Sequence, residues 1–184
     1  EILGLNKYIK YIPFVLFAIT LLGNLQFPLL WNDEAECAMH SKRVLEYGFP
    51  KVNDGKNKVY PIRHTDKTLA IDEETDAYIG IGWAMFYYGT IGVKLAEFSD
   101  DIYIKTLLLR LPFALLGLLG LWIFYSTFSK LLLTEKEKLL FSFFLFLFLM
   151  LHIDFALHLR EMRYYALVIF LASISTYLFI ENAS

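Results

Sequence analysis

The chain has 184 residues, enough for one ordinary domain; 57% of them are hydrophobic and 17% are aromatic. A soluble domain of this size cannot bury so much apolar surface, and a disordered chain does not contain it. The formal net charge of −2 offers no basic surface for nucleic acid, and the single cysteine excludes disulfide frameworks and multi-cysteine metal sites. The sequence starts at Glu1 and ends without a closing motif, so we expect part of a longer protein.

Four apolar stretches predict membrane-spanning helices, at about 11–31, 108–129, 139–159 and 164–180. Each contains an uncharged run that, at ~1.5 Å per residue, reaches across much or all of a ~30 Å hydrocarbon core. A fifth uncharged stretch, within 77–97, contains several glycines and an aromatic cluster, which favours the headgroup level. The expected fold class is therefore an all-α integral membrane protein. It is a polytopic transmembrane helix bundle that forms one domain over 1–184.

Charge placement decides how the fifth stretch is interpreted. If it does not span, two lysine clusters fall on one side of the membrane, which the positive-inside rule makes cytoplasmic. The lysines are Lys7, Lys10, Lys130, Lys136 and Lys138. We therefore expect 32–106 to be one long external loop with two juxtamembrane amphipathic helices, at about 34–47 and 77–97.

Local signals define the ends of these helices. Asp33 as N-cap and Glu36 three residues later have the capping-box spacing, and Gly48 supplies a C-terminal stop. Pro112 fits the first turn of the second span, where no amide donor is needed.

The side chains suited to chemistry lie at the external ends of the predicted spans. Asp33 and Glu34 follow the first span, while Arg160, Arg163 and Tyr164 precede the fourth at helical i, i+3, i+4 spacing. Arginines in a short external loop oppose the positive-inside bias, and guanidinium groups bind phosphate through paired donors. Carboxylates opposite arginines suggest a base that faces a phosphate-bearing substrate.

Two further acidic positions leave alternatives open. Asp154 and His158 have i, i+4 spacing and could share a metal, or they are polar residues satisfied by neighbours at the interface. Asp76 lies in an acidic loop and is either a solvated residue or a second acid of the site.

The motifs follow one another in an order that resembles a known family. The first apolar run is followed by Asp33-Glu34, then by a helix ending in Gly48-Phe-Pro50, and then by an aromatic helix ending near Gly92. Arg110-Leu-Pro112 opens the second span, and Arg160-Glu-Met-Arg-Tyr-Tyr-Ala-Leu167 opens the fourth. This series resembles the amino-terminal part of the GT-C glycosyltransferases, in the branch with protein O-mannosyltransferases and the bacterial aminoarabinose transferase.

The resemblance implies an integral, multi-pass membrane enzyme, which we expect in a bacterial or archaeal plasma membrane. It would move a sugar from a polyprenyl-phosphate donor to a hydroxyl of a lipid, glycan or protein acceptor, on the extracytoplasmic side and with inversion. Asp33, with Glu34, maps onto the catalytic acids. Arg160, Arg163 and Tyr164 map onto the region that binds the lipid phosphate or sugar, and Asp76 is a further candidate there. Members have more helices than four, so this chain would be an incomplete enzyme.

The resemblance implies no certain cofactor and leaves a divalent metal open, with the metal ligands unknown. It also leaves a phosphate-binding lysine unassigned, for which Arg63, His64 and Lys67 are candidates. The partners it implies are the lipid-linked donor, the acceptor and membrane lipids, without nucleic acid.

The alternative function is a non-catalytic polytopic scaffold or subunit whose external loop binds a partner. A transporter is disfavoured, because the predicted spans carry almost no charge at their centres.

Overall fold

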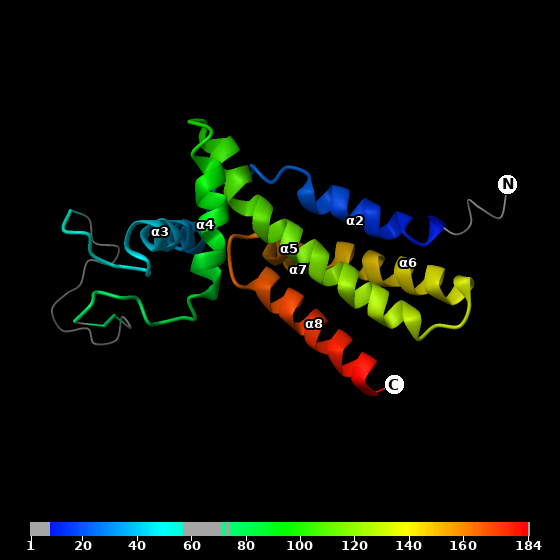
Figure 1. Cartoon of the computed structure of the whole chain (residues 1–184). Helices are drawn as coiled ribbons and strands as arrows, with labels where there is room; N and C mark the ends of the chain where they lie inside the picture. The colour runs from blue at the N-terminus through cyan, green and yellow to red at the C-terminus, as the bar shows by residue number, and fades with distance from the viewer. Residues whose placement is uncertain (1–7, 57–70, 73, 184) are drawn as a thin grey trace. The chain divides into compact units, whose positions relative to one another are not determined.

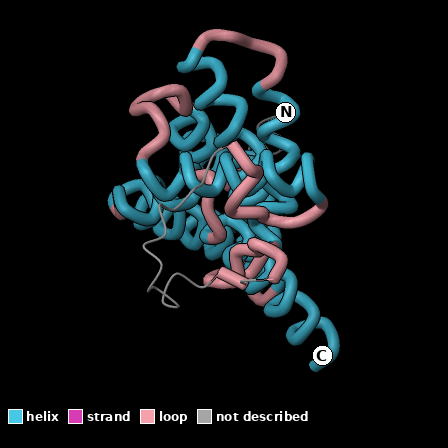
Figure 2. The backbone as a smooth tube through the Cα atoms, turned by 90° about the vertical axis from the view of Figure 1, so that its left-hand side faces the viewer, coloured by secondary structure: helices cyan, strands magenta, loops and turns pink. Residues whose placement is uncertain are grey.

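A computed structural model describes residues 8–56, 71–72 and 74–183, and every regular element among them is a helix (Figures 1 and 2). The helices are α2 (Ile12–Leu22), α3 (Asn32–Tyr47), α4 (Ala84–Ala96), α5 (Ile102–Lys130), α6 (Glu135–Leu151), α7 (Ile153–Arg160) and α8 (Tyr165–Ala183). Two isolated antiparallel bridges join Lys51 to Ala77 and Ile71 to Tyr78. The all-helical prediction is confirmed for these residues.

The chain divides into two compact units. Unit 1 consists of residues up to Leu25, Phe113–Glu161 and Tyr165–Ser184. Unit 2 consists of Gln26–Pro112 together with the short turn Met162–Tyr164. A long segment of chain thus separates the two parts of unit 2.

Of the helices that could cross a membrane, α6, α7 and α8 belong to unit 1, while α5 begins in unit 2 and continues into unit 1 from Phe113. Among the described residues, α5 and α8 are long and apolar enough to span, and α6 with α7 makes a third candidate if the pair counts as one span. These two or three helices are compatible with a membrane protein. Buried aromatic side chains form the centre of unit 1, where Phe17 and Tyr125 both pack against Phe146.

Helix α2 covers only the first half of the span predicted at 11–31. It ends at Leu22, Gly23 is extended, and Asn24 has a left-handed backbone with φ of 59°. Pro28 further on disfavours a helical residue before it and offers no amide donor. At 11 residues and ~1.5 Å per residue, α2 rises only ~16 Å, about half of a hydrocarbon core.

The stretch predicted as one span at 139–159 is broken. Helices α6 and α7 meet at His152 with a bend of 84°. His152 has φ of −85° and ψ of 82°, outside the helical region, although its amide still donates to the Phe148 carbonyl at 3.1 Å. The apolar pattern continues through the break, so periodicity alone predicted one helix.

Helix α5 begins earlier than the predicted 108. The Asp101 carboxylate accepts the backbone amides of Tyr103 and Ile104 at 2.8 and 3.0 Å and so caps the first turn. Pro112 therefore lies inside α5, not in its first turn, and the prediction for this proline is wrong.

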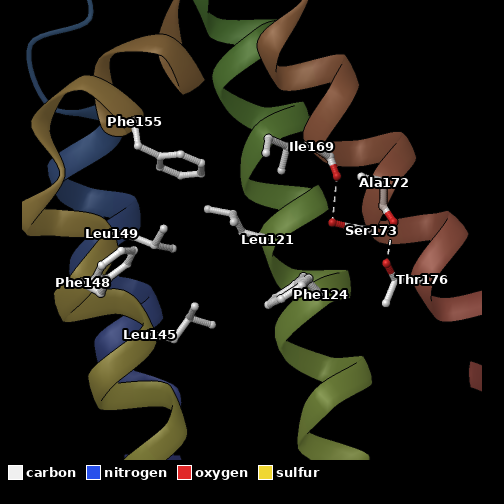
Figure 3. Close-up of a pocket in the computed structure, with 10 residues that line it drawn as sticks. All are labelled: Leu121, Phe124, Leu145, Phe148, Leu149, Phe155, Ile169, Ala172, Ser173 and Thr176. Atoms are coloured by element: carbon white, nitrogen blue, oxygen red, sulfur yellow. Dashed lines mark hydrogen bonds between the residues drawn. The ribbon is translucent and has the colours of Figure 1, made fainter.

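An apolar cavity of about 270 Å³ lies within unit 1, between α5, α6, α7 and α8 (Figure 3). Its walls include Leu121, Phe148 and Phe155. The hydroxyls of Ser173 and Thr176 also line it, but each donates to a carbonyl one turn back in α8, at 2.7 and 2.8 Å. Both hydroxyl donors are therefore already used within α8 and need no ligand in the cavity as an acceptor.

In unit 2, α3 packs against α4. Gly92 of α4 allows the backbone of α5 to approach closely, because a Cβ at this position would lie 2.7 Å from the Leu109 carbonyl oxygen. Helix α4 is shorter than the predicted 77–97, since Ala77 and Tyr78 take part in the two bridges instead. Gly48 ends α3 with φ of 81°, as the sequence predicted.

Candidate functional site

The first turn of α3 holds the two predicted catalytic acids. The helix begins at Asn32, with Trp31 as N-cap, so the predicted capping box of Asp33 and Glu36 is wrong. Glu34 occupies the third helical position, and its Oε2 accepts the Trp31 backbone amide at 3.4 Å. Helical geometry rotates successive side chains by about 100°. Asp33 and Glu34 therefore point in different directions.

Glu34 points inward and pairs with Arg110. The side chain of Glu34 is 0% exposed and that of Arg110 is 4% exposed. Arg110 Nε donates to Oε1 at 2.8 Å and Nη2 donates to Oε2 at 2.5 Å, a bidentate pair that joins positions 76 residues apart. Arg110 Nη1 donates to the Pro28 carbonyl at 2.7 Å, so each charge of this buried pair also has a backbone partner.

Glu34 also fixes a distant turn of the chain. Its Oε1 accepts the backbone amide of Met162 at 3.0 Å, across 128 residues of sequence. The Met162 side chain is fully buried, and its methyl lies against Gly89 of α4. The turn Met162–Tyr164 is thereby held against the start of α3.

Asp33 points outward and pairs with the next residue of this turn, Arg163. Asp33 Oδ2 lies 2.7 Å from Arg163 Nη1. The two side chains are 37% and 18% exposed, which leaves the carboxylate open to solvent. The guanidinium carbon lies 5.3 Å from the centre of the Trp31 ring and 5.4 Å from that of Tyr164. Unit 2 thus brings Asp33, Arg163 and Tyr164 together at one surface.

Two other predicted residues are placed elsewhere. Arg160 belongs to unit 1, where Nη2 donates to the Asn24 carbonyl at 2.5 Å and Nη1 to that of Gly23 at 3.5 Å. Asp76 has a left-handed backbone with φ of 59°, and its amide and carbonyl bond to Asp72 and Val52. The described contacts of Asp76 do not include Asp33 or Arg163.

The described residues contain no group of three or more histidine, cysteine, aspartate or glutamate side chains arranged to hold a metal. His158 contacts Glu161 at 2.9 Å, and Asp154 is exposed one turn earlier on α7. The candidates for a phosphate-binding lysine, Arg63, His64 and Lys67, lie outside the described residues.

Sequence reasoning did not identify Arg110 as a site residue. It was read only as a marker of the second span. One signal was available, because Arg110 is a charge close to a long apolar run and such a charge requires a partner.

Comparison of the chain with family models, curated proteins and solved structures finds no match.

Proposed function

We propose that the chain is the part of a GT-C-like membrane glycosyltransferase that carries its catalytic base and a phosphate-binding arginine. The observation that supports this most is the Asp33–Arg163 pair: a solvent-open carboxylate 2.7 Å from a guanidinium that comes from a distant turn. The apolar helices α5 and α8 are long enough to insert in a bilayer. We place this surface on the extracytoplasmic side, where a lipid-linked donor needs no nucleotide site.

In the proposed reaction, Asp33 acts on the acceptor hydroxyl and Arg163 acts on the phosphate of the donor. Asp33 accepts the proton of the acceptor hydroxyl as its oxygen forms a bond to the anomeric carbon of the donor sugar. The bond from that carbon to the phosphate oxygen breaks, and the polyprenyl phosphate leaves with the electron pair. Arg163 donates hydrogen bonds to the departing phosphate and neutralises its charge.

Arg163 must change partner for this to happen. A solvent-exposed ion pair contributes only about 0–1 kcal/mol. A phosphate offers the guanidinium paired, charge-assisted bonds, each worth about 1.5–3 kcal/mol. The donor phosphate therefore displaces Asp33 from Arg163. The freed carboxylate is then available to the acceptor hydroxyl, so the donor binds before the acceptor.

Glu34 has no part as a base in this proposal, although the sequence analysis grouped it with Asp33. Its side chain is fully buried, and its oxygens accept bonds from Arg110, Met162 and Trp31. An acceptor hydroxyl has no route to it. Arg160 and Asp76 remain predictions outside the proposed chemistry.

The test is sugar transfer by purified protein in lipid nanodiscs, from a panel of synthetic polyprenyl-phosphate sugars to membrane-extract acceptors. Released polyprenyl phosphate is measured by mass spectrometry. Asp33→Asn should lower turnover by about 10²–10⁴-fold, the usual contribution of a general base.

Asp100→Asn is the matched control. Asp100 is also an acid of unit 2, fully exposed and 3.8 Å from Lys105, and its substitution should leave turnover unchanged. Equal turnover of Asp33→Asn and wild type would exclude Asp33 as base. No release from any donor would favour the non-catalytic scaffold.

A further inference from the structure

The turn Met162–Tyr164 is the part of unit 2 that follows Pro112, and its place against α3 depends on the bonds it makes there. One of them is the Met162 amide to Glu34, and another is the ion pair of Arg163 with Asp33. The first is buried, and the second is partly exposed, with 18% of the Arg163 side chain and 37% of the Asp33 side chain accessible. The difference in burial indicates which of the two holds the turn.

The exposed pair is too weak to hold the turn by itself. An arginine loses up to about 2 kcal/mol of side-chain freedom when fixed, and an exposed ion pair contributes about 0–1 kcal/mol. A buried amide bonded to an ionised carboxylate is among the stronger hydrogen bonds in proteins. Arg110 in turn fixes that carboxylate through two bonds and is itself held by the Pro28 carbonyl.

We propose that Glu34 and Arg110 are positioning residues for the glycosyl-transfer site. They fix the backbone at Met162 and thereby place Arg163 between Asp33 and the incoming phosphate. The inference rests on the proposed function, because the position of Arg163 matters for transfer only if Arg163 binds the donor phosphate. Neither Glu34 nor Arg110 touches the substrate.

The experiment measures phosphate binding, so it does not depend on knowing the sugar. Trp31 is the reporter, because the Arg163 guanidinium lies over its ring. The whole chain, with Trp83→Phe and Trp122→Phe, is titrated with farnesyl phosphate in detergent micelles while Trp31 emission is followed. Wild-type Glu34 and Arg110 should give a saturable change, and Arg163→Ala should abolish or strongly weaken it.

Glu34→Gln/Arg110→Met removes both buried charges together, so neither is left unpaired. With Arg163 present, it should weaken farnesyl phosphate binding by about tenfold or more, as expected when a charge-assisted bond to the ligand is lost. With Arg163→Ala, the same double change should have no further effect on affinity. A merely structural role would lower the amount of folded protein equally in both backgrounds.

Arg43→Gln/Asp54→Asn is the matched control. It removes another largely buried pair of unit 2, in which Arg43 Nη1 lies 2.5 Å from Asp54 Oδ2. Neither residue is part of the site, so this variant should bind farnesyl phosphate like wild type. Arg110→Lys is a second variant that keeps the charge but not the paired donors, and it should weaken binding by an intermediate amount.

Three results would overturn the proposal. Wild-type affinity in the folded Glu34→Gln/Arg110→Met and Arg110→Lys variants would show that the pair does not position Arg163. Additive losses with Arg163→Ala would assign the pair a structural role alone. Wild-type affinity in Arg163→Ala would remove the phosphate role of Arg163 and so refute the proposed function itself, an outcome distinct from the first two.

Discussion

The first turn of α3 carries two adjacent carboxylates, each paired with an arginine from elsewhere in the chain, and the two pairs differ in their burial and in their bonding. Glu34 and Arg110 are almost fully buried, share two hydrogen bonds and have backbone partners as well. Asp33 and Arg163 form a partly exposed ion pair at 2.7 Å, beside two aromatic rings. Adjacent residues of one helix turn thus have opposite environments, because each step along a helix rotates the side chain by about 100°.

This difference in burial assigns the two pairs different roles: the buried pair stabilises the fold, and the more exposed pair is suited to binding a ligand. A buried pair is hard to open, since either charge alone would be left uncompensated in a region of low dielectric constant. An exposed pair opens at little cost and can exchange one partner for a ligand. The predictions below test whether the two pairs differ in this way.

The largest expected effect is on stability, at Glu34. Glu34→Ala leaves Arg110 buried without its counter-ion and should lower the free energy of unfolding by about 3–5 kcal/mol. Asp33→Ala should lower it by no more than about 1 kcal/mol, the value of an acid in the first turn of a helix. Thermal unfolding of the two proteins in micelles measures the difference. Similar losses for both would remove the distinction between the pairs.

Acid should destabilise the helix that carries both pairs. Burial, and secondarily the charge of Arg43, lowers the pKa of His40 to about 4, and the imidazole stacks on Tyr78 with ring centres 4.7 Å apart. The unfolded chain binds a proton near pH 6.5 and the folded chain does not. Stability is therefore fully present above pH 6.5 and falls by up to ~3 kcal/mol as pH drops to 4.

Unfolding curves between pH 4 and 7 measure this slope. His40→Gln removes the titrating group and should flatten it, even if the variant is less stable overall. A slope that is unchanged in His40→Gln would show that another group is responsible.

High salt should lower the coupling energy of one pair more than that of the other, and this difference is smaller than the effects above. At 1 M salt the screening length is about 3 Å, so the exposed Asp33–Arg163 pair should lose most of its coupling, a change of no more than about 1 kcal/mol. The buried Glu34–Arg110 pair should keep its coupling. Double-mutant cycles at low and high salt, each with Ala at one or both positions, give the two coupling energies. A salt-insensitive Asp33–Arg163 coupling would contradict its exposed character.

The smallest effect concerns Cys37, one turn after the two acids. Burial raises the pKa of its thiol to about 12, and the side chain is 1% exposed. The thiolate is the reactive form, so iodoacetamide at pH 8 should leave Cys37 unmodified in the folded protein and modify it in denaturant. Rapid labelling of the folded chain, followed by mass spectrometry, would show that the start of α3 opens frequently.

The helical fold was predictable because long apolar runs leave few alternatives. The positions at which the helices are interrupted or end were less predictable. The break at His152 interrupts an apolar run that a periodicity argument predicts as one helix. Helix α2 ends at Leu22, eleven positions before Asp33, because Gly23 and Pro28 lie between them. Both breaks are set by backbone geometry and packing, which the hydrophobic pattern does not contain.

For the candidate site, the residue types were predictable and the pairing was not. Asp33 and Arg163 were identified from charge near the ends of apolar runs and Tyr164 from its helical spacing, and unit 2 brings the three together. The sequence could not assign Arg163 to Asp33 and Arg110 to Glu34, because that choice depends on which face of one helix turn is buried. Nor did spacing separate Arg160, which shares the expected face with Arg163 but bonds to the carbonyl of Asn24.

The Glu34–Met162 bond also has a consequence for the order in which the protein is made. The ribosome completes Gln26–Pro112 well before Met162 exists, and the residues synthesised in between belong to unit 1. Until then, the Glu34 oxygen that will accept the Met162 amide has only Arg110 to satisfy it and must retain water. The Glu34–Met162 bond of unit 2 therefore forms after most of unit 1 has been synthesised. A nascent chain arrested before Met162 should expose the start of α3 to protease, and one arrested after the turn has left the ribosome should protect it.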